Sequence, residues 1–223
     1  MKGSTLGDSD PGTLGMPHLE TPMPSRKTVD EKHPKDGLAV IPFTTPAELE
    51  AWLETHHAAS PGIWLKLAKK GSGVPSINWE EAVEAALCFG WIDGQRQSRD
   101  ATYFLQRLTP RSKRSIWSKV NTEKVAALIA SDRMRLAGLA EVDRAKADGR
   151  WETAYAAQSK AEVPEDLQAF LDGHPDAAAF FATLTSQNRF AFLFRLHNAK
   201  KPETRARRLA EFTRMLRAGE TFY

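Results

Sequence analysis

The sequence predicts an α+β protein in which a small mixed α/β unit with a short sheet is followed by a C-terminal helical bundle. Apolar residues alternate with a period of two at residues 63–68 and 103–108, as in half-buried strands, and helical patterns lie between them. From Val163 onward every pattern is helical. A chain of 223 residues, 41% of them hydrophobic, is long enough for one substantial core and an appended helical unit.

The composition divides the chain into three parts. Residues 1–36 hold five prolines and four glycines without a period of 2 or 3.6, so they bury too little apolar surface to offset the entropy of ordering. We therefore expect a disordered N-terminal extension there. Residues 37–158 are expected to form the α/β unit, and residues 159–223 the C-terminal helical domain.

Local signals place the first elements of the α/β unit. Residues 38–43 predict an edge strand, because Pro42 cannot donate a hydrogen bond to a ladder. Thr45 followed by Pro46 predicts a capped helix start. Asn78 predicts the N-cap of a second helix, which ends at Gly90.

The stretch from Ala86 to Gln95 (ALCFGWIDGQ) is the point around which the unit is organised. A helical pattern breaks at Gly90, and Asp93 and Gln95 follow at once, in what we expect to be a tight turn. The strand at residues 103–108 comes next and stops before Pro110.

Two helices complete the α/β unit, and each has an apolar stripe that should face the core. The first, capped by Asn121, carries Val125, Leu128 and Ile129. The second, which ends near Gly149, carries Leu136, Leu139, Ala140 and Val142. The helices of the C-terminal domain are expected to begin at Pro164, Asp176, Ser186 and Pro202.

Charge and cysteine content constrain the class of protein. The net charge of +3 favours anionic partners only weakly, so the local distribution of charge must decide. The single cysteine, Cys88, excludes an internal disulfide and suits a reducing compartment. No run reaches the roughly 18 apolar residues that span a bilayer, and no secretory signal is recognisable. We expect a cytoplasmic protein without membrane insertion.

A basic, aromatic segment is the strongest candidate for a binding surface. Residues 94–124 contain eight cations and two acids, which gives 8 − 2 = +6, and aromatic residues are interleaved with them. Such a segment suits phosphate contacts and base stacking, or it is a solvated face whose aromatics point inward. Together with Trp91, Asp93 and Gln95 of the turn, its candidate ligand-binding residues are Arg107, Arg111, Lys113, Arg114, Trp117 and Lys119.

A second basic cluster lies near the C-terminus. Arg205 and Arg208 are three residues apart on one helical face, where they could clamp a carboxylate or phosphate, or form salt bridges to a neighbouring helix.

Metal chemistry is poorly supported, because His56 and His57 point about 100° apart on a helix. Cys88 lies in an apolar stripe, as a core thiol does. We expect no metal and no cofactor.

Several motifs together resemble the YdeI/OmpD-associated family, described as bacteriocin-protection proteins. They are the ALCFGWIDGQ stretch, TPR at 109–111, WSK at 117–119, Asn121, ADGRW at 147–151, and the segment from Val163 through AKKPETRARR at 199–208 to Gly219. The resemblance covers residues 38–219. It implies a role in resistance to bacteriocins or cationic peptides and, for some members, association with an outer-membrane porin. It implies no catalytic residues.

These observations lead to one functional expectation and two alternatives. We expect a cytoplasmic, non-enzymatic stress or resistance protein that binds an anionic ligand or protein partner through a basic groove beside Asp93. Without an export signal, direct contact with a porin is not expected. The first alternative is a nucleic-acid-binding module that uses residues 94–124. The second is an enzyme acting on a small anionic substrate, with Asp93 as acid or base and Arg111 as the substrate clamp.

Overall fold

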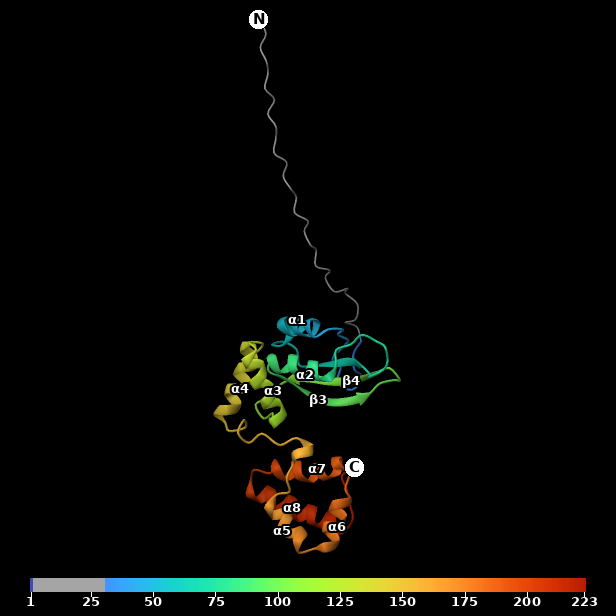
Figure 1. Cartoon of the computed structure of the whole chain (residues 1–223), viewed down its shortest axis with the longest axis vertical. Coiled ribbons are helices and arrows are strands. Elements are labelled where there is room, and N and C mark those ends of the chain that lie inside the picture. Colours follow the sequence, from blue (N-terminus) through green and yellow to red (C-terminus); the bar gives the residue numbers. More distant parts are fainter. Residues whose placement is uncertain (2–30) are drawn as a thin grey trace.

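The structure, a computed structural model, describes Met1 and residues 31–223, which form a sheet-containing unit followed by a helical unit (Figure 1). The sheet has four strands in the order β1-β2-β4-β3. Their bounds are Val40–Ile41 for β1, Ile63–Ala68 for β2, Trp91–Ser98 for β3 and Tyr103–Pro110 for β4. β1 pairs in parallel with β2, whereas the other pairs are antiparallel. The α+β architecture predicted from the sequence is confirmed, with β1 at an edge as expected.

Helices α1 (Pro46–His56) and α2 (Trp79–Cys88) pack on the sheet through one continuous core. Both begin where their capping residues predict. The Thr45 side chain accepts a hydrogen bond from the Glu48 amide, and Asn78 forms a reciprocal capping box with Glu81. The apolar stripes of both helices meet the inward-facing residues of β2 and β4 in this core.

The prediction of a tight turn at Asp93 and Gln95 is wrong, because these residues lie in strand β3. The turn of the chain between α2 and β3 occurs before them, at Gly90, whose φ of +73° is a conformation that favours glycine. The strand then starts at Trp91, and a β-bulge lies between Asp93 and Arg96. β3 is an edge strand with many polar residues, so it lacks the apolar alternation by which strands are recognised.

The two helices after the sheet also differ from expectation in detail. α3 (Lys119–Ala130) is capped by Ser118 rather than Asn121, because the Ser118 side chain accepts a hydrogen bond from the Asn121 amide. Ile129 is exposed instead of buried. In the stripe predicted for α4 (Leu136–Ala147), Val142 is buried as expected, whereas Leu136 is 86% exposed and Ala140 is exposed. The small residues Gly138 and Ala145, which the stripe did not include, are buried together with Val142. The fit of backbone against backbone therefore decides the buried face of α4, where side-chain hydropathy predicts another.

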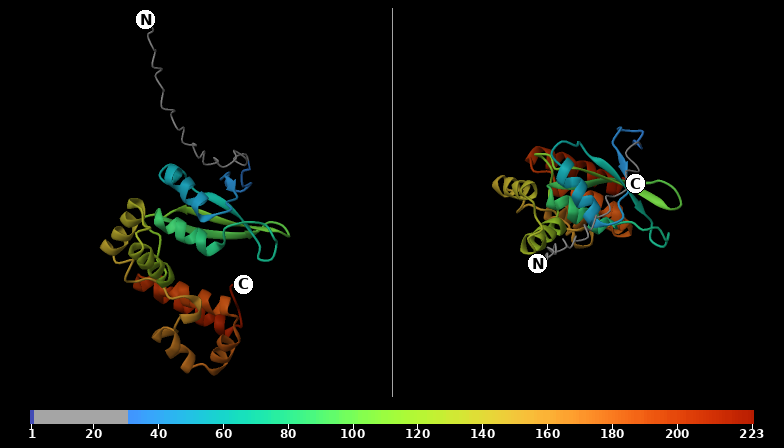
Figure 2. Two further views of the ribbon diagram at one scale, coloured as in Figure 1. Left: turned by 45° about the horizontal axis from the view of Figure 1, so that its top comes forward. Right: turned by 90° about the horizontal axis from the view of Figure 1, so that it is seen from above.

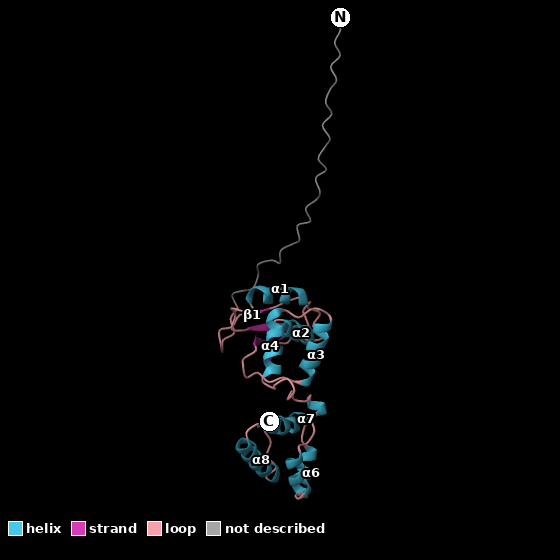
Figure 3. Ribbon diagram, turned by 90° about the vertical axis from the view of Figure 1, so that its left-hand side faces the viewer, coloured by secondary structure: helices cyan, strands magenta, loops and turns pink. Residues whose placement is uncertain are grey.

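The C-terminal unit contains a short 3₁₀ helix η1 (Gln158–Lys160) and the helices α5 (Glu165–Asp172), α6 (Pro175–Thr183), α7 (Ser186–His197) and α8 (Pro202–Arg217). Figure 3 shows it as a separate group of helices joined to the sheet-containing unit by an irregular segment. Its core is built on aromatic rings, with Phe192 and Phe212 in an edge-to-face arrangement. The predicted helix starts agree with these bounds to within about one residue.

The N-terminal segment enters the fold earlier than expected. Of the extension predicted over residues 1–36, residues 2–30 lie outside the described residues. Residues 31–36, in contrast, pack against the sheet: the buried His33 ring stacks on Trp64, and the Asp36 carboxylate accepts a hydrogen bond from the Trp64 indole. Within the part that the structure describes, none of the helices is long and apolar enough to cross a membrane.

Candidate anion-binding groove

The structure distributes the candidate residues of β3 over different environments. Trp91 is buried in the core, and its indole nitrogen donates a hydrogen bond to the His57 carbonyl. Asp93 is half-buried and accepts a hydrogen bond from the Trp79 indole nitrogen at 3.2 Å. Gln95 lies exposed within the bulge. Of these three residues, Asp93 is the one whose side chain has a polar contact beside a surface groove.

Arg111 is an internal cation in this structure. Its side chain is 6% exposed, and its guanidinium lies 3.4 Å from the ring centroid of the buried Trp117. Nη1 donates to the Ile116 carbonyl, whereas Nε and Nη2 have no hydrogen-bond partner among the described residues and no contact with solvent. Burial lowers the pKa of Arg111 to about 10, so it remains charged at neutral pH. The alternative in which Arg111 clamps a substrate therefore finds no support in this geometry.

The remaining candidates fall into two groups. Arg107 forms an ion pair with Asp36, on the part of the sheet that the N-terminal segment covers. Lys113, Arg114 and Lys119 are exposed and form no ion pair among residues 31–223. The structure therefore does not assemble the predicted residues into a single groove.

Arg205 and Arg208 join helices to one another. The Arg205 guanidinium makes a bidentate contact with Asp166, with Nε and Nη2 at 2.7 and 2.8 Å, and donates from Nη1 to the Leu196 carbonyl. Arg208 donates to the Arg195 carbonyl. Of the two interpretations of this cluster, the geometry favours the one in which the arginines bind a neighbouring helix.

In the sheet-containing unit, a groove of about 510 Å³ with a positive lining opens near the β3–β4 hairpin. Residues of β2, of the loop that follows it, of the first turn of α2 and of strands β3 and β4 line the groove. Figure 2 shows this loop and the β3–β4 hairpin extending from the same end of the sheet. Lys69, Lys70 and Arg96 line it, and no acidic residue is among its described lining residues. None of these three cations forms an ion pair within the described part of the chain.

Local structure holds two of the three cations of the groove, Lys69 and Arg96, in place. The Lys69 amide donates to the Thr102 carbonyl and its Nζ to the Asp100 carbonyl, which ties the loop to the hairpin. Arg96 lies 3.9 Å from the ring centroid of Phe104, a cation–π contact.

The bulge in β3 decides which side Arg96 faces. Asp93 is in register with Leu108, and Arg96 with Gln106, which places both residues on one face of the sheet. In a regular strand, residues three apart point to opposite faces. The extra residue of the bulge thus brings Arg96 to the side on which Asp93 contacts Trp79.

Trp79 links the groove to Asp93. It is the first residue of α2, it is 41% exposed, and it lines the groove. Burial raises the pKa of the Asp93 carboxyl, and the hydrogen bond from Trp79 opposes this effect. Because Asp93 accepts this hydrogen bond and does not itself line the groove, it holds the indole ring of Trp79 in one orientation at the edge of the groove.

Sequence reasoning missed the groove because its residues come from separate elements. The stretch from Lys69 to Gly73 (KKGSG) predicts only a turn, and the structure forms one there, with positive φ at Gly71 and Gly73. Two lysines before a glycine-rich turn are a usable signal for an anion site. The contribution of Arg96 is not recognisable from the sequence, since it depends on the bulge.

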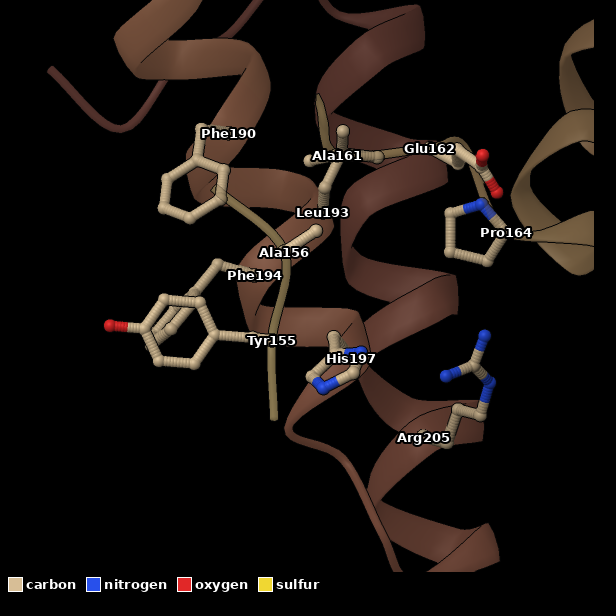
Figure 4. A pocket seen from close by; sticks show the side chains of 10 residues that line it. All are labelled: Tyr155, Ala156, Ala161, Glu162, Pro164, Phe190, Leu193, Phe194, His197 and Arg205. Atoms are coloured by element: carbon tan, nitrogen blue, oxygen red, sulfur yellow. The ribbon is translucent and has the colours of Figure 1, made fainter. Parts of the chain in front are cut away.

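A second cleft, of about 240 Å³, lies where the segment after α4 passes over α7 and α8 (Figure 4). Tyr155 packs edge-to-face on Phe194, and these rings form an aromatic wall opposite Pro164 and Arg205. The charge of Arg205 is already matched by Asp166, and Glu162 adds a carboxylate. This cleft therefore offers an anion no unmatched positive charge.

Among the described residues, no cluster of three or more His, Cys, Asp or Glu side chains could hold a metal ion.

Two family models match the chain, one in each unit. Residues 160–219 match the family described as Bacteriocin-protection, YdeI or OmpD-Associated. The helical unit therefore matches this family's model over most of its length. Residues 41–141 match a model described as a domain of unknown function (DUF8412), and the ALCFGWIDGQ stretch falls there. The resemblance expected over residues 38–219 is thus confirmed for its C-terminal part. Comparison with curated proteins and with solved structures gives no match.

Proposed function

We propose that the α/β unit binds an anionic ligand in the groove lined by Lys69, Lys70 and Arg96. The observation that carries the proposal is the sign of this lining: the described residues around an open volume of about 510 Å³ include three cations and no acid. Its size falls within the roughly 300–1,000 Å³ of small-molecule sites. Low-dielectric walls concentrate the field of such cations within a cleft, so that an anion is attracted even though the whole chain has a net charge of only +3.

The glycine-rich loop supports the same proposal. A Cβ atom added at Gly71 or Gly73 would meet no atom within 4 Å, so the backbone of the loop is open on that side. Successive backbone amides in a turn with positive φ form concave anion-binding sites. Phosphate and carboxylate groups suit such a loop, because they accept several hydrogen bonds at once.

We further propose that the chain is a cytoplasmic stress or resistance protein, in line with the family of its C-terminal unit. A positive groove repels cationic peptides, so protection would proceed through the anionic ligand or through a partner protein rather than by trapping the peptide. The single cysteine, which is buried, suits a reducing compartment.

Calorimetric titration with inorganic pyrophosphate tests the groove. We expect binding to the wild-type chain that weakens with added salt, and a loss of about tenfold or more in Lys69→Gln/Lys70→Gln. Lys113→Gln/Arg114→Gln is the matched control, because it removes the same number of cations at positions outside the groove. If both double variants lost pyrophosphate affinity equally, the loss would come from the lower net charge of the protein and not from the groove. No binding at low salt would refute the proposal.

A nucleic-acid-binding function remains a second candidate because Lys113, Arg114 and Lys119 are exposed and unpaired among the described residues. Such cations contact phosphates without reading sequence. Fluorescence polarisation with labelled oligonucleotides at two salt concentrations tests it. Binding that falls at least tenfold with salt, and that is lost in Lys113→Gln/Arg114→Gln, is the expected result. Binding that survives in this variant would exclude this surface.

A further inference from the structure

We propose that the ligand of this groove carries a planar ring as well as an anionic group, as a nucleotide does, and that the ring stacks on Trp79. This inference rests on the proposed function, since it names the ligand class of the same groove. It extends that function from anion binding, which cations alone explain, to the recognition of a base.

The position of Trp79 is the first observation. Tryptophan carries a large apolar surface, yet this residue is 41% exposed and lines the groove that holds the three cations. Aromatic rings beside cations are an arrangement by which proteins bind single-stranded nucleic acids, in which the ring stacks on a base and the cations contact the phosphate. Trp64, Trp91 and Trp117, in contrast, are buried.

The fixed orientation of the indole is the second observation. Its nitrogen donates to Asp93 Oδ2 at 3.2 Å, and α2, on which it stands, begins at a complete capping box. A side chain already held in one rotamer loses little entropy when a ring stacks on it. A merely solvent-exposed tryptophan needs no such acceptor, because water satisfies its N–H group.

Asp93 thus becomes a positioning residue for the ligand site. It is half-buried, burial raises its pKa, and the positive charge of Arg111 acts in the opposite direction. Asp93 is not among the described residues that line the groove, and its carboxylate is linked to the groove by the hydrogen bond from Trp79, which does line it. A substitution at Asp93 that removes the acceptor for the indole should therefore alter ring recognition and leave the contact of the lysines with phosphate intact.

Three probes separate the parts of the proposal in calorimetric titrations: adenosine monophosphate, ribose 5-phosphate and inorganic phosphate. We expect the nucleotide to bind about tenfold more tightly than ribose 5-phosphate. Trp79→Leu should abolish this preference, whereas Trp79→Tyr, which keeps a ring, should retain much of it. Circular dichroism establishes that each variant is folded.

The variants at Asp93 test the positioning role. Asp93→Asn keeps an acceptor for the indole and should keep the preference, whereas Asp93→Leu should weaken nucleotide binding without weakening phosphate binding. A short single-stranded oligonucleotide, compared with the mononucleotide, shows whether the base comes from a free nucleotide or from a nucleic acid.

The outcomes distinguish this inference from the function on which it rests. If ribose 5-phosphate binds as tightly as the nucleotide, or if Trp79→Leu leaves the preference intact, base stacking is refuted and anion binding stands. If none of the three probes binds and pyrophosphate also fails, both proposals fall.

Discussion

Replacing Gly138 by alanine sets two effects of known sign against each other at one buried position. Gly138 lies inside helix α4, where alanine is favoured over glycine by about 1 kcal/mol. A Cβ atom at this position would lie 2.3 Å from the Cys88 carbonyl oxygen and 2.8 Å from the Leu87 carbonyl oxygen. Propensity alone therefore predicts a more stable protein, and packing predicts a less stable one.

The geometry indicates that packing wins. Both atoms that the new methyl group meets belong to the backbone at the C-terminal end of α2, so no side-chain rotation relieves the overlap. α4 must move away from α2, which separates Val142 and Ala145 from the core. Overpacking costs about 1–3 kcal/mol, and because the overlap is with backbone atoms we expect a cost of about 2–3 kcal/mol here. Subtracting a gain in propensity of about 1 kcal/mol leaves a net destabilisation of roughly 1–2 kcal/mol.

Tryptophan fluorescence during urea unfolding measures the effect on the correct unit. All six tryptophans lie between residues 52 and 151, so the signal reports the α/β unit and not the helical unit. Ala140→Gly is the control on the same helix, because Ala140 is exposed. It should cost about 1 kcal/mol through propensity alone. A Gly138→Ala chain that is as stable as wild type, or more stable, would refute the close approach of α4 to α2.

Two further predictions concern titratable groups. Arg205 lowers the pKa of Asp166, so their ion pair stabilises the helical unit fully above the ordinary pKa of an aspartate side chain, and this contribution is lost as the pH falls through the lowered value. Arg205→Met should destabilise the unit by about 1 kcal/mol at neutral pH, with less further loss in acid than wild type, as measured by circular dichroism. An acid profile identical to that of wild type would contradict this role. Burial raises the pKa of Cys88 to about 11, so iodoacetamide at neutral pH should modify Cys88 only after unfolding, as mass spectrometry would show. Fast alkylation of the folded chain would show that the thiol is accessible.

The sequence by itself determined the class of fold and most element boundaries. Capping residues predict where α1 and α2 begin. This signal can be read from the sequence because the cap side chain accepts its hydrogen bond from an amide only three residues further along the chain. Alternation identifies β2 and β4, which are buried in the middle of the sheet. The motifs near the C-terminus identify the family of the helical unit, which the match to residues 160–219 confirms.

The tertiary structure decided the site. Arg111 is a candidate by its charge, but its distance from solvent depends on how Trp117 packs against it. Arg205 is a possible clamp by its spacing, but Asp166, 39 residues away, is its partner. Both outcomes are non-local, since they depend on residues that only folding brings together.

The groove itself shows the same limit. A bulge of one residue sets the face of Arg96, and the loop after β2 carries Lys69 and Lys70 to the same volume. Local sequence fixes where a strand begins, but the pairing of that strand with its neighbour fixes which side chains point inward. Residue type was therefore readable from the sequence alone, whereas the convergence of these residues with Trp79 required the assembled sheet.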